Sequence, residues 1–573
     1  MLRIFLCGAG SILAGLIFAV AANAQCPAPP AFYSIGGAAG YASSGDFSLD
    51  SEGILIRDYG SEYNNLGKFR NPLFISNYAH RLYRDWYDGD CKDVELRSKF
   101  LKQADYLVRG AEWRQGMAVW PYPFYNKFFE LPAGWISGIT QSLVAGVMIR
   151  ASRMTGDATY DKLASAALLP YRRSISEGGV ISFGDGVRWI EEAPDTKGRS
   201  YRILNGHITA IRGVVDVNTL APSPDLEVII REAIDAVSRD ISLFDAGFLS
   251  FYSLDFPGGD IPKAAINDYN IQHVSQLLWL FEFSKRKIFL DYALKFQSYE
   301  TQGITFDASK SIAPKTNGPS KAGALYYSYY WSTSTFPAWI EARWPESRTL
   351  MGIGVDALET INTPKNFSVS VSDDGLQWHR IFATRDNSRK QFYVRFSPRK
   401  ALAVRLEVDQ AHSNILALQA MMPVFSDRTA TAISDSCNYR SSIIDGRTRY
   451  NFDFATDADD GKNMSVYCPG WILLRPKEND SLMLAGTGKA DAQFRIEDSD
   501  DLQDWQLVGS VPVSIEPATF SAPRKWKSYV RVSFDGPDKI SEINTVKVIP
   551  PVVDAIESDA SIETMPFASS TRH

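Results

Sequence analysis

The sequence predicts a multidomain α plus β protein, with a barrel-like α/α toroid of helices followed by two β-sandwich modules. The first observation is length, because 573 residues exceed one ordinary core and indicate about three or four domains. The second is a run of helix-period apolar segments over residues 70–302. The third is a change to strand alternation after that point, with an internal repeat. The 45% hydrophobic and 22% charged content is typical of a folded soluble protein.

The N-terminus has the pattern of a secretory signal peptide over residues 1–24. Arg3 supplies the basic start, residues 4–20 are apolar, and Ala22-Asn23-Ala24 is a small-x-small cleavage site. We therefore expect a mature chain that begins at Gln25 and is exported to the periplasm or the cell exterior. No later apolar run approaches the length that spans a membrane.

Four cysteines remain once Cys7 leaves with the signal peptide. An even number in an exported chain predicts two disulfides. Proximity favours the pair Cys437–Cys468, and elimination then leaves Cys26–Cys91. The spacing of these cysteines matches no zinc pattern.

Residues 25–69 are rich in Pro, Gly, Ser and Tyr and predict an irregular segment with a few strands. The first long helix begins at Asn71, because Pro72 fits the first turn. Helices paired antiparallel through short links are typical of an α/α toroid. Further helices are expected at 93–111, 136–155, 158–173, 206–217, 225–242, 268–284 and 286–300.

The helix after Trp135 is unusually rich in small residues. Gly138, Ser142 and Gly146 lie within it. A glycine inside a helix costs about 1 kcal/mol relative to alanine. The pattern therefore predicts the close approach of a neighbouring helix or of a ligand.

The β region contains two copies of one module, expected at 303–428 and 429–552, before a polar tail at 553–573 that we expect to be disordered. Each copy has an acidic turn, Leu-Gln and a Trp, then Phe-Ser, Pro-Arg-Lys and a strand with a central Arg. The pattern resembles discoidin-like β-sandwiches, a resemblance that implies sugar binding. Trp378 and Trp505 are predicted to pack in the modules rather than to hold a ligand.

Several classes of function lack support. The net charge of −6 argues against nucleic acid as the main partner. The six histidines are scattered, so no zinc or other metal site is predicted. Motifs for a serine nucleophile elbow or a phosphate-binding loop are missing from the sequence. We expect no cofactor; the acidic turns are compatible with structural Ca²⁺, but no ligand set is readable.

Acids and tyrosines gather late in the helical region. Glu191 and Glu192 stand together in the stretch Trp-Ile-Glu-Glu-Ala-Pro, shortly before a helix. Tyr252 and Tyr269 lie where a loop meets a strand or a helix, which is where toroids place cavity residues. Adjacent acids before a helix can also be a solvated loop, so the rest of the motif decides between the two interpretations.

Five pieces within residues 134–277 carry a resemblance to a known family. They are GWISGITQSLVAGVMIRASRMTGDATY, WIEEAP, RILNGHITAIRGVVD, LFDAGFLSFYSLD and DYNIQHVSQL, in this order. Over about residues 70–300 the chain resembles the C-terminal domain of D-glucuronyl C5-epimerases. This resemblance implies an isomerase that inverts C5 of uronate residues in an acidic polysaccharide.

The resemblance also implies site residues. It assigns proton transfer to Glu192, with Glu191 as a possible catalytic or supporting neighbour, and to Tyr252 and Tyr269, and it makes Asn205 the asparagine of its Leu-Asn-Gly motif. Inversion needs two proton carriers that face each other across the sugar ring, and we assign these to Glu192 and Tyr269, with Tyr252 assisting. The remaining candidates for substrate binding are Arg202, as a carboxylate clamp, and His273.

Three positions depart from the family pattern. Ala193 replaces a tyrosine, Asp255 replaces an arginine, and Asn270 replaces a histidine. An acid at Asp255 would repel a uronate carboxylate unless it is paired or turned away. Two alternatives therefore stay open, a uronan polysaccharide lyase and a non-catalytic secreted polysaccharide-binding protein. The expected partner is an acidic polysaccharide, and the sequence leaves a homodimer open.

Overall fold

The computed structural model describes most of the chain and divides it into two compact units, Met1–Tyr450 and Asn451–His573. The described residues are 26–34, 37–43, 45–60, 66–184, 187–245, 249–255, 263–265, 269–297, 299, 304–323, 330–425, 432–435, 464–465, 470–474, 476, 478, 480–501, 504–536 and 539–549. The predicted signal peptide, the Cys437–Cys468 pair and the C-terminal tail lie outside them. The domain boundary expected at 302 falls within the first unit and stays a prediction.

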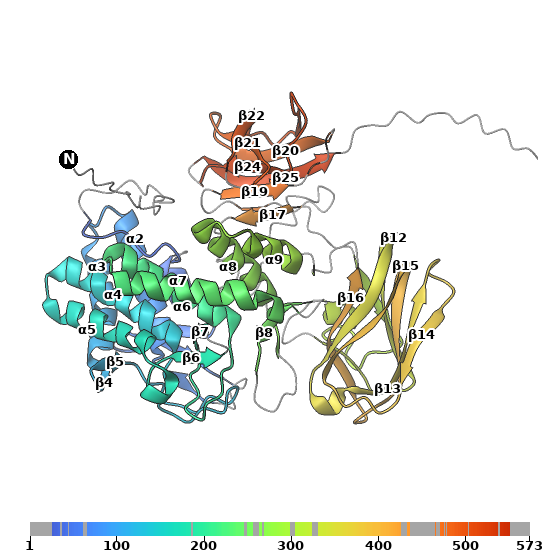
Figure 1. Ribbon diagram of the computed structural model, residues 1–573, viewed down its shortest axis with the longest axis horizontal. Coiled ribbons are helices and arrows are strands. Elements are labelled where there is room, and N and C mark those ends of the chain that lie inside the picture. Colours follow the sequence, from blue (N-terminus) through green and yellow to red (C-terminus); the bar gives the residue numbers. More distant parts are fainter. Residues whose placement is uncertain are drawn as a thin grey trace, which may run out of the picture. The chain divides into compact units, whose positions relative to one another are not determined.

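Eight long helices follow one another in the first unit (Figure 1). They are α2 (Pro72–Asp88), α3 (Val94–Arg109), α4 (Gly138–Thr155), α5 (Ala158–Leu168), α6 (Leu204–Leu220), α7 (Pro224–Asp240), α8 (Tyr269–Ser284) and α9 (Lys287–Gln297). Their starts follow local chemistry, since the side chains of Asn71, Asp93 and Asp157 each accept a hydrogen bond from a first-turn N–H. Among the described residues, no helix is both long and apolar enough to cross a membrane.

These helices pack as four successive pairs. Each even-numbered helix packs on the next helix in sequence, and α2, α4, α6 and α8 also pack in series on one another. Near the N-terminus, Phe32 stacks on Trp279 of α8 at 5.8 Å between ring centroids, while Tyr33 contacts His80 of α2 at 5.5 Å. The N-terminal segment therefore touches both the first and the last of this series. Closure of the helices into a toroid stays a prediction.

The segment before the helices is short and mixed. It holds α1 (Ala38–Ala42) and a three-stranded sheet of β1 (Phe47–Leu49), β2 (Leu55–Asp58) and β3 (Lys68–Phe69). A disulfide joins Cys26 to Cys91, with 5.7 Å between the Cα atoms. This bond anchors the start of the described chain to the turn after α2.

The small residues of α4 serve helix packing. A Cβ on Gly213 of α6 would lie 2.6 Å from the Cβ of Ser142, and one on Gly146 would lie 3.0 Å from a carboxylate oxygen of Asp216. Real Cβ atoms need more room, so these positions bring α4 and α6 together. Of the two explanations offered by the sequence, the neighbouring helix is the one the structure shows along this part of α4.

Three short two-stranded sheets lie in the connections between the helices. They are β4 (Glu112–Arg114) with β5 (Met117–Val119), β6 (Ile181–Gly184) with β7 (Val187–Ile190), and β8 (Phe251–Ser253) with β9 (Lys263–Ala264).

The first unit ends in a large curled sheet of seven strands (Figure 1). The strands are β10 (Thr305–Ala308), β11 (Trp331–Thr333), β12 (Ala338–Ala357), β13 (Pro364–Ser372), β14 (His379–Thr384), β15 (Gln391–Ala411) and β16 (Leu416–Phe425). Strands β12 and β15 are the longest of the sheet and pair with each other on both sides of two irregularities. On β12 these register shifts fall between Arg343 and Arg348 and between Leu350 and Gly352. Because such bulges bend a sheet, residues on both sides of the shifts, such as Ile340 and Ile353, can belong to one apolar core. β17 (Ala432–Asp435) follows.

The second unit is all β in its described part. Its strands are β18 (Met464–Ser465), β19 (Gly470–Leu474), β20 (Ser481–Gly488), β21 (Gln493–Ser499), β22 (Gln506–Pro512), β23 (Ala518–Ser521), β24 (Tyr529–Phe534) and β25 (Ile540–Ile549). β19, β24, β21 and β22 pair in that order, and β18, β25, β20 and β23 form another sheet.

The repeat read from the sequence is also a repeat of contacts. The guanidinium of Arg405 lies 4.0 Å from the ring centroid of Trp378, and that of Arg531 lies 4.3 Å from the ring centroid of Trp505. Each Trp therefore covers the central Arg of its own copy. Both rings are half-exposed, so neither is the core residue expected from the sequence. The discoidin-like family assignment itself stays a prediction.

Candidate active site

The two adjacent acids follow directly from the hairpin β6–β7. Trp189, the third residue of β7, is buried and stacks on His207 of α6 at 4.0 Å between ring centroids. The N–H of Ile190 donates to His207 Nδ1 at 2.9 Å, which leaves Nε2 to donate to the Ala233 carbonyl at 3.0 Å. Burial lowers the pKa of His207 to about 4, so the ring is neutral at neutral pH. A rigid aromatic stack thus fixes where the acids emerge.

Glu191 is fully buried and has a complete set of hydrogen-bond donors. Its carboxylate accepts from Ser182 Oγ and Ser200 Oγ, both at 2.6 Å, and from the backbone N–H of Arg202 at 3.1 Å. Its backbone carbonyl accepts from the N–H of Gly138, where α4 begins, at 3.1 Å. Three donors aimed at one carboxylate stabilise its charged form.

Glu192 is half-buried and differently surrounded. Its Oε2 is buried and has no hydrogen-bond partner among the described residues. The pKa of both acids is raised to about 7, by burial for Glu191 and by burial together with the negative charge of Glu191 for Glu192. Since the donors all point at Glu191, we place the negative charge there and the more strongly held proton on Glu192.

Gly206 of α6 makes room for Glu192. A Cβ at this position would lie 2.6 Å from the Glu192 Cβ and would clash with Oε2. We expect Gly206→Ala to displace the Glu192 carboxyl and to lower the turnover of the substrate by about a hundredfold or more, as a small misplacement of a reacting group does. The fold should persist, because alanine favours a helix. Gly40→Ala, where a Cβ meets nothing within 4 Å, is the control, and unchanged turnover in Gly206→Ala would contradict the assignment.

Asn205 precedes that glycine and is also buried. Its Oδ1 has no hydrogen-bond partner within the described ranges, while its backbone carbonyl accepts from Gln276 Nε2 of α8 at 3.0 Å. Buried polar atoms without partners are uncommon in native proteins. Two of them belong to Asn205, which precedes Gly206, and to Glu192, which packs against Gly206.

The two tyrosines predicted from the sequence meet in space. Tyr252 lies on β8, and Tyr269 begins α8; their ring centroids are 4.6 Å apart. Both rings pack in an apolar cluster that also contains Ala193, the residue after Glu192, and Trp135. The tertiary fold therefore brings the acid motif and both tyrosines to the same region.

Arg202 and His273 are placed less directly. Arg202 donates its backbone N–H to Glu191, but its guanidinium forms an ion pair with the buried Asp240 at 3.2 Å. His273 is fully buried and contacts Ser250 Oγ through Nδ1 at 2.7 Å, and burial lowers its pKa to about 3. Arg202 is thus engaged with the protein, whereas His273 keeps Nε2 without a hydrogen-bond partner among the described residues. Contact of either side chain with substrate stays a prediction.

The departure at Asp255 is compensated locally. One carboxylate oxygen of Asp255 lies 3.9 Å from Nε of Arg199. An acid paired in this way repels a substrate carboxylate less than an isolated one would. Ala193, by contrast, is buried in the aromatic cluster and supplies no hydroxyl.

Sequence reasoning missed Tyr122. This tyrosine is buried, its hydroxyl lies 2.7 Å from Thr140 Oγ1, and its ring stacks on Trp135 at 3.8 Å. Burial raises the pKa of the Tyr122 hydroxyl, and the negative charge of Glu192 adds to the rise. Tyr122 therefore lies near enough to Glu192 for their charges to interact. The dense aromatic stretch from Trp120 to Tyr125 was the available signal, but it does not show which ring faces the acids.

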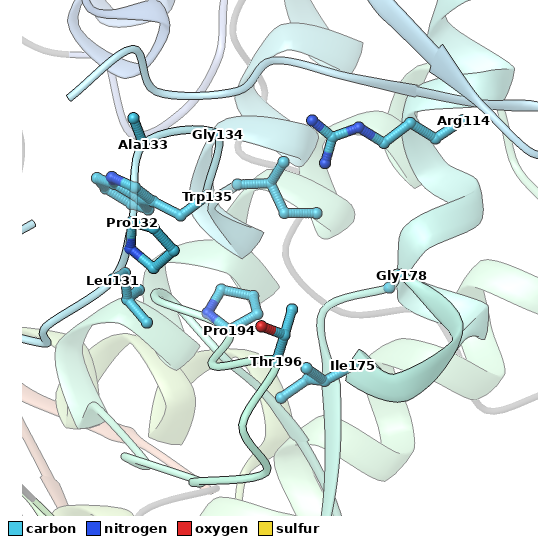
Figure 2. Close-up of a pocket in the computed structure, with 12 residues that line it drawn as sticks. Arg114, Leu131, Pro132, Ala133, Gly134, Trp135, Ile175, Gly178, Pro194 and Thr196 are labelled. Carbon is cyan, nitrogen blue, oxygen red and sulfur yellow. The ribbon is translucent and has the colours of Figure 1, made fainter. Parts of the chain in front are cut away.

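A cavity of about 160 Å³ adjoins the acid loop (Figure 2). Arg114 borders it on one side, and Leu131, Pro132 and Trp135 on the other, with Pro194 and Thr196 between them. Pro194 is only two residues beyond Glu192. Arg114 is held by Glu112, since Nε and one carboxylate oxygen are 2.8 Å apart. An aromatic face, a cation and a hydroxyl around a small cavity suit a sugar ring with an acidic group.

Two helices begin beside the acid motif, α4 with the Gly138 N–H that donates to the Glu191 carbonyl and α6 with Gly206 against Glu192. Neither Ser137 before α4 nor Ile203 before α6 caps its helix with a side-chain hydrogen bond. The first N–H groups of a helix and its dipole favour negative charge. The described residues contain no group of three or more acid, His or Cys side chains that could hold a metal ion.

The site falls within a segment similar to a known family of carbohydrate epimerases. Residues 114–298 match the family model described as the D-glucuronyl C5-epimerase C-terminus. The chain is 30% identical over 206 residues to the D-glucuronyl C5-epimerase of Caenorhabditis elegans, covering 33% of this chain and 33% of that enzyme. It is 22% identical over 268 residues to an uncharacterized protein of Methanocaldococcus jannaschii, covering 44% of this chain and 84% of that protein. The chain thus spans only about a third of the C. elegans enzyme.

Comparison with solved structures is weaker. A family 32 carbohydrate-binding module of Clostridium perfringens, in complex with galactose, is 12% identical with a TM-score of 0.20, over 21% of this chain and 93% of that one. Allantoicase is 9% identical with a TM-score of 0.26, over 38% of this chain and 80% of that one. Likenesses of this size carry no argument about ligand or fold.

Proposed function

We propose that this protein is a polysaccharide uronate C5-epimerase that inverts C5 of uronic acid residues. The observation that carries the proposal is the pair of buried oxygens without partners, Glu192 Oε2 and Asn205 Oδ1, beside the contacting rings of Tyr252 and Tyr269. All four residues lie within the segment that matches the epimerase family.

Inversion of C5 needs a base on one face of the sugar ring and an acid on the other. In our scheme, ionised Glu192 takes the C5 proton, and the electron pair of that C–H bond moves into the neighbouring carboxylate as an enolate. Tyr269 then donates its phenolic proton to C5 from the opposite face. Exchange with water restores both groups, so that no redox step is needed.

Glu191 supports this chemistry without taking part in it. Its charge is held by three donors, and it raises the pKa of Glu192 toward neutrality, where a carboxylate is a stronger base. The N-terminus of α6, which no side chain caps, favours the negative charge that builds on the enolate. This electrostatic help compensates in part for the missing arginine at Asp255.

The cavity beside the acid loop extends the site along a polymer. In this proposal Trp135 and Arg114 receive a neighbouring sugar of the chain, with the acidic group of that sugar toward Arg114. The ligand is an acidic polysaccharide met after export, as the N-terminal signal pattern predicts.

A uronan lyase is the second candidate. It would begin with the same proton abstraction and then expel the substituent at C4. The same acid and tyrosines serve either reaction, so the product decides between them. A binding protein without catalysis is the third candidate, and the pairing of Asp255 with Arg199 weakens its main support.

The direct test follows the substrate in deuterated water. Glucuronate, mannuronate and galacturonate polymers are each incubated with the full chain and followed by NMR. Deuterium at C5 with intact chains supports the epimerase, and an unsaturated product supports the lyase. Binding without exchange in any of these polymers would overturn both.

The raised pKa of Glu192 sets the pH dependence of the reaction. The base must be ionised, and its pKa is about 7 rather than the ordinary 4.5. We therefore expect kcat/KM to rise with pH through a midpoint near 7 and to fall about tenfold per pH unit below it. A midpoint near 4.5 would contradict the burial-based assignment.

The raised pKa values of Glu191 and Glu192 have the opposite effect on the free energy of unfolding, which falls as pH rises. Because the folded pKa of Glu191 and Glu192 exceeds the unfolded value, the folded protein holds more protons between pH 4.5 and about 7. This contribution to stability is present at low pH and is lost as pH rises through the folded pKa, which urea unfolding on either side of the midpoint would show.

A further inference from the structure

The Pro-Arg-Lys motif of the β module has different ionic partners in the two copies. In the second copy, Arg524 donates to both carboxylate oxygens of the buried Asp498, at 2.5 and 2.7 Å. Lys525 forms an ion pair with Glu478. Both cations of that motif are therefore neutralised by the module itself.

Strand register identifies the equivalent positions in the first copy. On β21 and β24, Asp498 is opposite Val530 and precedes the turn where Ser499 donates to Asp501. On β13 and β15, Val371 is opposite Val404 and precedes the turn where Ser372 donates to Asp374. Val371, which is buried, thus stands where the second copy has the acid that neutralises its arginine.

The first copy leaves its motif exposed and unneutralised. Arg399 and Lys400 are both exposed, and no carboxylate of the described residues forms an ion pair with either. Arg395 on the same strand is also exposed. Their partners on β12 are Gly352 for Arg395, Leu350 for Arg399 and Thr349 for Lys400. Side chains alternate along a strand, so Arg395 and Arg399 share one face of β15, with partners two residues apart on β12, and Lys400 lies on the other face.

The surrounding sequence strengthens this positive charge. Residues 379–400, which comprise β14, the following loop and the first part of β15, contain seven Lys or Arg and one acid, Asp386. The whole chain carries a net charge of −6. A concentrated positive surface on an acidic protein attracts polyanions locally while the remainder of the protein repels them.

We propose that Arg395 and Arg399, which we call the basic strand, bind the anionic polysaccharide on the first β module. The choice of ligand rests on the proposed function, because it is the same acidic polymer. Guanidinium groups pair with carboxylates through two parallel hydrogen bonds, which suits a chain with a regular repeat of carboxylates. The second copy lacks this activity, because its equivalent cations are already paired.

The test uses the full chain with Arg395→Ser and Arg399→Ser together. Binding of a long glucuronate polymer is measured by calorimetry at low and at high salt. We expect the dissociation constant of the double variant to rise about tenfold at low salt and the salt dependence of binding to weaken. The control is Lys102→Ser with Arg231→Ser, which removes the same charge from exposed positions on the helices.

Three outcomes would overturn the inference. Affinity could be unchanged in the double variant, the control could lose as much affinity, or a DNA duplex could bind more tightly than the polymer. The proposed function is judged separately, by C5 exchange in a short oligosaccharide. Loss of binding in the double variant without exchange by the native protein would support the basic strand and contradict the epimerase.

Discussion

Glu192→Gln is expected to abolish deuterium exchange at C5 of the polysaccharide. Glutamine keeps the size and the hydrogen-bonding reach of the side chain but cannot accept the C5 proton at neutral pH. General base catalysis contributes about 10²–10⁴-fold, so exchange should fall at least that far. Tyr269→Phe should cause a comparable loss, because it removes the proton carrier of the opposite face. Exchange is measured by NMR in deuterated water.

The control for this pair is Glu227→Gln, an exposed acid in the first turn of α7. It removes the same charge far from the described contacts of the site and should leave exchange unchanged. Thermal unfolding of each variant separates loss of chemistry from loss of fold. A native exchange rate in Glu192→Gln or in Tyr269→Phe would remove that residue from the proton-transfer pair.

Arg150→Met is expected to destabilise the protein by about 3–5 kcal/mol, which is the cost of leaving a buried charge without its partner. Arg150 of α4 is fully buried and donates to both carboxylate oxygens of Asp216 of α6, at 2.7 and 2.8 Å. Its Nε donates to the carbonyl of Pro29 at 3.0 Å. One side chain therefore ties together the two helices beneath the site and the N-terminal segment.

Two comparisons make this result interpretable. Arg150→Met with Asp216→Leu removes both charges and should recover much of the loss, since the penalty comes from the isolated carboxylate. Arg172→Met breaks the exposed pair with Asp225 and should cost less than about 1 kcal/mol. Equal losses for the buried and the exposed pair, in urea unfolding, would be incompatible with this account.

Much of the fold could be predicted from local sequence. Helix starts are set within one turn, so Asn71 with Pro72 marks the first residue of α2 correctly. The run of paired helices and the repeated β module also follow from patterns a few residues long. Closure of the helices into a ring depends on contacts between distant elements, and the sequence prediction of a toroid remains to be tested.

For the site, the sequence by itself determined which acids and tyrosines occur and in what order, because these are properties of the chain. Only the tertiary structure decided their environments. Adjacent in sequence, Glu191 meets three donors from other segments, whereas Glu192 faces Gly206 and keeps an oxygen without a partner. The same is true of the repeat, where the motif is shared but the acid that neutralises it is not. Electrostatic environment depends on neighbours brought together by folding, and local sequence does not contain them.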